Sequence, residues 1–131
     1  MRILAAAMLL AAACAKCAAM DCADQTQFGL DVCANASFES ADRALNDAYR
    51  EIIRRLASDV RAKQSLIAAE TAWIAFRDAE CAFKASSSEG GSIHPMEVSL
   101  CLEDETRRRI KDLQAYLHCA EGDLSCPVPA Q

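Results

Sequence analysis

Glycine, proline and aromatic residues are scarce in this 131-residue sequence. It contains four Gly, three Pro and one Trp, and aromatic residues make up only 5% of the chain. A sheet with many tight turns needs more glycine and proline, so an all-β fold is disfavoured. The remainder is rich in alanine and leucine, which are strong helix formers. We therefore expect an all-α protein.

An excess of positive charge is also missing. The formal net charge is −5 at pH 7, with 14 basic and 19 acidic residues. If the first 19 residues are removed, Arg2 and Lys16 go with them, and 12 basic residues against 19 acidic ones give a net charge of −7. Nucleic acids and anionic membranes attract clustered basic side chains, so neither is expected as a partner. The charge balance mildly favours a cationic partner.

Residues suited to catalysis or metal binding are few. The histidines are His94 and His118, and no Ser-His-Asp pattern is present. Together with Cys101 and Cys119 they include zinc-ligand types, but their spacing matches no common zinc site, and the thiols of an exported chain oxidise first. We therefore predict no enzymatic activity, no metal and no cofactor.

One group of charged residues could be interpreted as an acid–base catalytic cluster. Arg77, Asp78 and Glu80 are close in sequence, and Arg109 could approach them from a neighbouring helix. A guanidinium that bridges carboxylates such as Asp78, Glu80 or Glu105 would fix the helix register without any chemistry. We favour this interpretation and expect ion pairs between helices.

The N-terminal segment has the features of a secretory signal peptide. Arg2 is followed by an almost purely apolar run over residues 3–13, which is too short to span a bilayer stably. Cleavage after Ala19 would leave six cysteines, an even number that suits an oxidising compartment. Lipid attachment at Cys14 is the alternative and would leave seven free thiols. We expect an exported protein, periplasmic or secreted, or alternatively a lipid-anchored envelope protein.

The 112 residues that would remain are enough for one domain. Apolar periodicity and the positions of helix breakers predict three antiparallel helices, without a sheet or a membrane span, within a domain of residues 20–118. These helices are expected chiefly over residues 26–57, 60–86 and 95–118. Residues 119–131 are expected to form a C-terminal tail, extended from Leu124 onward.

Helix ends are marked by capping residues. Asp24 and Gln27 have the spacing of a capping box, and Ser58 or Asp59 is expected to cap the second helix. A new cap at Ser37 would split the first helix in two, and this alternative stays open. Gly122 is expected to close the third helix. The inward faces are predicted to hold Leu45, Tyr49, Ile52, Ile53 and Leu56 in the first helix, and Leu102, Thr106, Ile110, Leu113 and Leu117 in the third.

The second predicted helix carries a broad apolar stripe. Trp73, Phe76, Glu80 and Phe83 share one helical phase, and four further positions widen the stripe: Leu66, Ile67, Ile74 and Cys81. Such a wide face predicts that this helix lies at the centre of the core. Arg77, Asp78 and Glu80 are then expected at its margin, where long polar side chains can reach water or each other.

Several of these elements together resemble one known family. The strongest is the segment Trp73-Ile74-x-Phe76-Arg77-Asp78-x-x-Cys81, followed by Gly90-Gly91-Ser92, Cys101 and Thr106-x-x-Arg109. Weaker matches are Cys33-Ala34, Ala41-Asp42 and Leu45-Asn46-x-x-Tyr49. Over about residues 22 to 117 the chain resembles the LprI-like lysozyme inhibitor domain family. The resemblance implies a small, exported, all-helical envelope domain, and it implies lysozyme inhibition only as an attribution to a founding member.

The six cysteines after Ala19 are expected to form disulfides. A Cys81–Cys101 bridge would join the end of the second helix to the start of the third and contribute about 3 kcal/mol. The next simplest pairs are Cys22–Cys33 and Cys119–Cys126, although six cysteines permit 15 connectivities and the sequence does not choose among them.

The loop over residues 86–95 is a candidate binding element. Gly90, Gly91, Ser92 and His94 lie between two half-cystines, so the loop would be partly preorganised for insertion into a partner's cleft. The alternative is that the glycines simply make the turn. Two functions follow: a protein inhibitor that occupies the cleft of lysozyme or binds another cationic envelope protein, or an accessory envelope protein that binds another cell-wall or protein partner.

Overall fold

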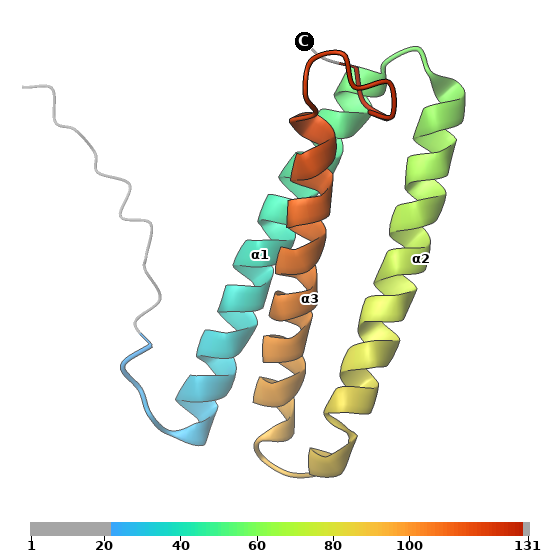
Figure 1. The fold of residues 1–131 in the computed structure, drawn as a ribbon. Coiled ribbons are helices and arrows are strands. Elements are labelled where there is room, and N and C mark those ends of the chain that lie inside the picture. Colours follow the sequence, from blue (N-terminus) through green and yellow to red (C-terminus); the bar gives the residue numbers. More distant parts are fainter. Residues whose placement is uncertain (1–21, 130–131) are drawn as a thin grey trace, which may run out of the picture.

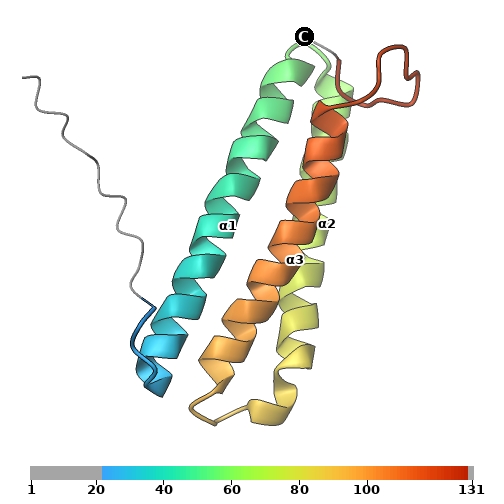
Figure 2. The same ribbon diagram turned by 60° about the vertical axis from the view of Figure 1, so that its left-hand side comes forward.

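A computed structural model describes residues 22–129, and the expected signal peptide and Cys14 lie outside them. Three antiparallel helices make up the fold: α1 (Gln27–Leu56), α2 (Val60–Lys84) and α3 (His94–Leu117), with a short 3-10 helix, η1 (Ser86–Ser88), before α3 (Figures 1 and 2). None of the described residues forms a strand. The all-α prediction is confirmed, and each predicted helix end lies within two residues of the observed one. No helix over residues 22–129 is both long and apolar enough to cross a membrane.

The start of α1 is set by Thr26. Its side chain accepts a hydrogen bond from the Gly29 amide at 3.1 Å, while Asp24 Oδ1 accepts from the Thr26 amide at 2.8 Å. The predicted cap at Asp24 is therefore wrong by two residues, because Asp24 supports the cap from outside the helix. A Cβ on Gly29 would lie 2.4 Å from the Asp24 Cγ, so this turn requires glycine.

The other predicted helix signals have mixed outcomes. α1 continues through Ser37, whose hydroxyl donates to Glu103 Oε1 on α3 at 3.2 Å, so the alternative of a split helix is wrong. Asp59 caps α2 as predicted, accepting from the Ala62 amide at 2.9 Å. The C-terminal cap of α3 is His118 and not Gly122. Gly122 lies in the C-terminal tail and has a φ of +80°.

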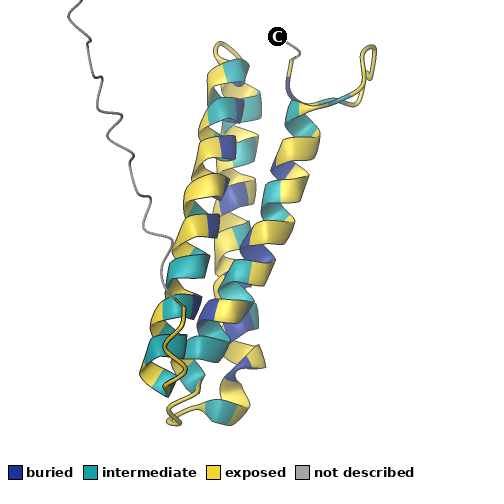
Figure 3. Cartoon of the chain, turned by 90° about the vertical axis from the view of Figure 1, so that its left-hand side faces the viewer, coloured by how far each residue is buried: buried dark blue, intermediate teal, exposed yellow. Residues whose placement is uncertain are grey.

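The core lies mainly between α1 and α3, which pack along their length. Figure 3 shows the buried positions as a stripe on the facing sides of the helices. Leu113 of α3 is completely buried, and so is Thr106, about two helical turns earlier on the same face. The predicted inward faces of both helices are confirmed at the following buried positions: Leu45, Ile52, Leu56, Thr106 and Leu113.

The prediction that α2 lies at the centre of the core is wrong. Phe76 and Phe83 are 55% and 75% exposed, Ile67 and Ile74 are exposed, and Trp73 is only partly buried. The buried residues of α2 are Glu70, Arg77 and Cys81. The apolar positions of α2 spread over more of the helix than its neighbours cover, so only one narrow row, rich in charge, faces α1 and α3. The periodicity identified a helix but not its inward face.

The C-terminal tail folds back over the upper end of the bundle. Val128 is 4% exposed and packs in the same core cluster as Leu56 and Leu113. Arg55 Nη1 also donates to the carbonyl of Leu117 at 3.0 Å, which holds the end of α3 against α1. The expected extended tail is therefore wrong, because a buried valine and a disulfide fix it.

All three disulfides follow the simplest pairing. The Cα–Cα distances are 5.5 Å for Cys22–Cys33, 5.6 Å for Cys81–Cys101 and 5.9 Å for Cys119–Cys126. The first closes the segment that leads into α1, the second ties α2 to α3, and the third closes the tail. The predicted disulfide-stapled bundle is confirmed.

Candidate functional site

A cavity of about 560 Å³ lies at the lower end of the bundle, beside the loop between α2 and α3. It is lined by residues of all three helices and the loop, and it joins two sets of predicted site residues. The lining residues are Phe38, Arg77, Asp78, Cys81, Ala82, Ser86, Glu89, His94, Val98 and Leu102. The tryptophan-to-cysteine segment and the end of the glycine loop therefore meet at one place.

Arg77 is the central charged residue of this region. Its Nε donates to Asp78 Oδ1 at 2.9 Å, and its Nη1 lies 3.6 Å from Asp42 Oδ1 on α1. The guanidinium carbon lies 5.4 Å from the Phe38 ring centroid and 5.1 Å from that of Trp73. Such contacts favour a buried guanidinium. Arg77 was expected at the margin of the core, reaching water or its polar neighbours. It does pair with Asp78, but it is buried and not at a solvated margin, because two rings and two carboxylates compensate for its burial.

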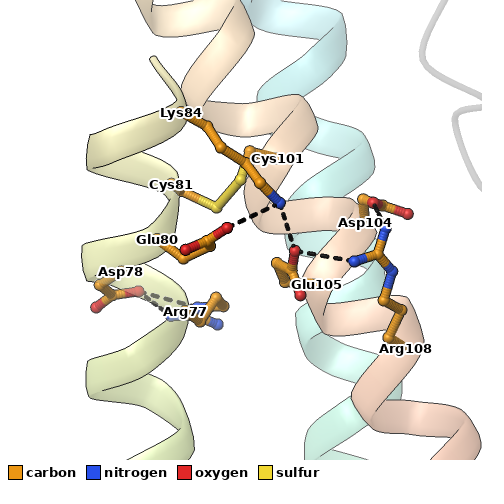
Figure 4. The surroundings of a disulfide bond; sticks show 9 residues. All are labelled: Arg77, Asp78, Glu80, Cys81, Lys84, Cys101, Asp104, Glu105 and Arg108. Atoms are coloured by element: carbon orange, nitrogen blue, oxygen red, sulfur yellow. Dashed lines mark hydrogen bonds and ion pairs between the residues drawn. A yellow bond between two sulfur atoms is a disulfide. The ribbon is translucent and has the colours of Figure 1, made fainter. Parts of the chain in front are cut away.

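A second ionic cluster surrounds the Cys81–Cys101 disulfide (Figure 4). Lys84 Nζ lies 2.8 Å from Glu105 Oε1 on α3 and 3.4 Å from Glu80 Oε1. The hydrogen bond to Glu105 is the main reason that the pKa of Lys84 is raised above its usual value, with a smaller contribution from Glu80. Arg108 also donates to Glu105, at 3.1 Å. Ion pairs between helices were predicted for this region: Lys84 forms one with Glu105 across α2 and α3, while Arg108 binds Glu105 from within α3. Arg77 bridges Asp78 and Asp42 across α2 and α1, as predicted for a guanidinium at this position.

Arg109 instead pairs with Glu70, a residue that sequence reasoning missed. Arg109 Nε donates to Glu70 Oε1 at 2.8 Å, and Nη2 donates to the same oxygen. Burial by itself would lower the pKa of Arg109, but the hydrogen bond and charge of Glu70 outweigh it, so this pKa is raised. Glu70 lies seven residues before Arg77 and so on the same face of α2. That spacing was the signal that could have identified it.

The candidate binding loop is ordered by its own hydrogen bonds. The Gly91 amide donates to the Ser88 carbonyl at 2.8 Å, and Gly90 has a φ of +77°, a region that favours glycine. His94 Nδ1 lies 3.1 Å from the Ala85 carbonyl and 3.2 Å from Ser88 Oγ. His94 thus fastens the loop to the end of α2, whereas Gly90, Gly91 and Ser92 are exposed.

The chemistry of this region suits binding. Six cysteines are paired in disulfides, and no group of potential metal ligands gathers anywhere in residues 22–129. The carboxylates of Asp78 and Glu89 line the cavity beside the apolar side chains of Phe38, Val98 and Leu102. Arg77 lines the same cavity and is paired with Asp78, so it is Glu89 together with the apolar lining that complements a basic side chain with a long aliphatic stem.

Comparison with known proteins gives the family. The family model described as "Lysozyme inhibitor LprI" matches residues 17–113, about three-quarters of the chain. The chain belongs to the LprI lysozyme inhibitor family. A relative from Rhizobium meliloti (strain 1021), named "Uncharacterized protein R02472", is 32% identical over 108 residues, which cover 74% of this chain and 78% of the relative. No solved structure matches the chain significantly.

The region that matches the LprI family contains the ionic and disulfide elements described above. It includes Arg77 and the two aromatic rings that contact it, the Glu70–Arg109 ion pair and the Cys81–Cys101 disulfide. The third disulfide and Val128 follow the matched region. The LprI match therefore covers the three helices up to Leu113 and leaves the folded tail outside.

Proposed function

We propose that this LprI-family protein is an exported, non-catalytic lysozyme inhibitor that contacts the enzyme's cleft with its α2–α3 loop. The observation that carries the proposal is the position of Gly90, Gly91 and Ser92, exposed beside a cavity whose lining includes Asp78 and Glu89. Lysozyme inhibition is the activity in the family's description. A protruding loop next to carboxylates fits a basic enzyme with a concave substrate site.

Preorganisation supports the role of this loop. The Cys81–Cys101 bridge joins the two helices that flank it, and hydrogen bonds from Gly91 and His94 restrict it further. A loop that is already ordered loses less conformational entropy when it binds. The acidic balance of the chain, −5 overall, would also accelerate encounter with a basic enzyme.

A turbidity assay tests the proposal. Purified, oxidised protein is added to lysozyme and a suspension of bacterial cell walls, and the rate of clearing is followed. We expect slower clearing that saturates with added protein and weakens at high salt. Unchanged clearing at about tens of micromolar protein, a range in which a specific interface of ordinary size is occupied, would exclude lysozyme inhibition. The accessory-protein hypothesis would then be tested by co-sedimentation with purified cell walls.

Point variants locate the contact. Ser92→Ala and Glu89→Gln change exposed groups near the cavity and should weaken inhibition while the melting temperature stays unchanged. Asp47→Asn, an exposed position on the outer side of α1, is the matched control for lost negative charge. Gly91→Val is less specific, because a Cβ there would lie 3.0 Å from the Ser88 carbonyl oxygen and would strain the loop. If Ser92→Ala, Glu89→Gln and His94→Ala all leave inhibition intact, the loop is only a turn.

A further inference from the structure

One flank of α2 carries a regular row of exposed apolar side chains. Val60, Ile67 and Ile74 are 63%, 48% and 44% exposed and follow each other at intervals of seven residues. Residues at this spacing fall on one side of a helix, and β-branched residues repeated every seven positions are typical of a seam between packed helices. Within residues 22–129 no other helix covers this row.

The row borders a groove between α2 and α1. A cavity of about 370 Å³ is lined on the α2 side by Ile67, Glu70, Thr71, Ile74 and Arg77 and on the α1 side by Asp42, Leu45, Asn46 and Tyr49. Its charged residues are paired, Glu70 with Arg109 and Arg77 with Asp42. The hydroxyl of Thr71 donates to the Ile67 carbonyl at 2.8 Å, so its hydrogen-bonding need is met within the helix. The groove can therefore accept apolar side chains without leaving the threonine hydroxyl unpaired.

The same flank carries opposite charges at its two ends. At the lower end, Asp42 and Asp78 share one guanidinium, Arg77, so one negative charge is left over, and both carboxylates are substantially exposed. At the upper end, the amine of Lys63 binds the Ala57 carbonyl and has no carboxylate within ion-pair distance in the described part of the chain. Lys63 and Asp78 are 15 residues apart, or roughly 22 Å along the helix.

We propose that a second copy of this chain docks on this flank, with the two α2 helices antiparallel about a two-fold axis that passes between Glu70 and Thr71. This symmetry places Ile67 opposite the partner's Ile74, and Lys63 opposite the partner's Asp78. Each contact occurs twice, because a two-fold interface pairs the same patch with itself. The Lys63 amine then balances the negative charge left over beside Arg77.

Charge complementarity within one helix favours a second copy over a foreign helix. The spacing from Lys63 to Ile67 equals that from Ile74 to Asp78, so the apolar and ionic contacts form together in the antiparallel register. No like charges meet at the axis, since Glu70 points toward Arg109 and is buried with it. The interface shares Asp78 with the cavity beside the α2–α3 loop but leaves Glu89 and the exposed Gly90-Gly91-Ser92 segment outside it. It does not depend on lysozyme inhibition.

Sedimentation equilibrium of the purified, oxidised protein tests the proposal without lysozyme. We expect a reversible monomer–dimer equilibrium at micromolar concentration. Lys63→Glu and Asp78→Lys should each weaken the dimer roughly tenfold, since each replaces two ion pairs by two repulsions. The double variant restores the pairs in reversed order and should recover most of the affinity. Lys111→Glu, at an exposed position on α3, is the control and should leave the dimer unchanged.

Ile67→Asp separates the dimer from a general loss of fold. Ile67 is already half exposed, so circular dichroism should show intact helices while dimerisation is lost. A protein that stays monomeric at about 100 µM would overturn the proposal, because a specific symmetric interface is populated at that concentration. A dimer that survives Ile67→Asp, or one that the double charge reversal does not restore, would also overturn it.

Discussion

Arg109 of α3 donates from Nε to Glu70 Oε1 of α2 at 2.8 Å, and both side chains are largely buried. This pair joins the two helices halfway along the bundle, where α2 contributes no large buried apolar residue. The attachment of α2 therefore depends on paired charge. Removing Arg109 leaves the Glu70 carboxylate buried, and removing Glu70 leaves the Arg109 guanidinium with Asp112 Oδ2, 3.8 Å from its Nη1, as its remaining carboxylate.

Glu70→Ala should lower the free energy of unfolding by about 3 kcal/mol, the cost of a largely buried guanidinium that keeps only a long ion pair with Asp112. Urea unfolding followed by circular dichroism measures it. The double variant Glu70→Leu with Arg109→Met removes both charges and should regain most of the loss. Arg50→Ala removes a fully exposed pair with Asp47 and should change the unfolding free energy by less than about 0.5 kcal/mol. An equal loss in both single variants would contradict a special role for the buried pair.

Thr106→Val should stabilise the protein. The hydroxyl of Thr106 is completely buried and has no hydrogen-bond partner among the described residues. Valine has nearly the same shape, so the substitution removes the desolvated hydroxyl and should raise the unfolding free energy by about 1 kcal/mol. Thr71→Val is the matched control, because that hydroxyl is exposed and bonded to the Ile67 carbonyl. A destabilised Thr106→Val variant would mean that the hydroxyl has a partner in solution.

Trp73→Ala should cost about 2 kcal/mol, less than the roughly 3–5 kcal/mol lost when a fully buried large side chain is truncated. Trp73 is only partly buried, but its ring covers the guanidinium of Arg77. Trp73→Phe keeps a ring at this position and should lose about half as much. Thermal unfolding of the wild type and the two variants ranks their stabilities. Equal losses of stability for Trp73→Ala and Trp73→Phe would exclude a contribution from the ring contact.

Replacing Cys81 and Cys101 together by alanine should lower the unfolding free energy by about 3 kcal/mol, as the loss of a 20-residue cross-link predicts. Alanine is chosen because Cys81 is buried. The same change at Cys119 and Cys126, which are seven residues apart, should cost somewhat less, since the closed loop is shorter. Denaturant titrations compare the two. A larger loss from the tail bridge would show that Val128 leaves the core when the tail is released.

Glu51 should contribute to the acid sensitivity of the fold. Hydrogen bonds from Arg54 and then Arg55 lower the pKa of this carboxyl from 4.5 to about 2. The unfolded chain takes up a proton near pH 4.5 while the folded chain stays ionised, so the contribution is present above pH 4.5 and is lost as the pH falls toward 2. Glu51→Gln should therefore lower the melting temperature at pH 7 but not at pH 2. Glu121→Gln, in the exposed tail, should shift neither value.

The sequence predicted the helices and disulfides well because those signals are local. Apolar periodicity predicted α1 and α3, and the glycine loop predicted where α2 ends. Asp59 was expected to cap α2, and the structure confirms these three features. The simplest pairing, between cysteines close in sequence, is the one that the structure shows, although the sequence alone left 15 connectivities open. Each of these depends on neighbouring residues more than on the packing of the whole chain.

The role of α2 and the composition of the candidate site depend on packing between helices, and they were harder to predict. Apolar residues on several sides of α2 left its inward face ambiguous, and a charged row faces inward in place of Phe76 and Phe83. Pairing Arg109 with Glu70 required knowing that face. The folded tail was missed because a single valine in a segment with two prolines carries no periodicity.

The helix order also gives the molecule a direction relative to any surface that holds its N-terminus. α1 starts at the same end of the bundle as the α2–α3 loop, whereas the closed tail occupies the opposite end (Figure 1). Cys14 precedes Cys22 by eight residues, which span at most about 28 Å. A lipid on Cys14 would therefore confine the loop to the zone next to the membrane, while cleavage after Ala19 would free it to meet enzymes throughout the surrounding fluid. If the proposed inhibition holds, the processing of the first 19 residues decides which lysozyme molecules this loop can encounter.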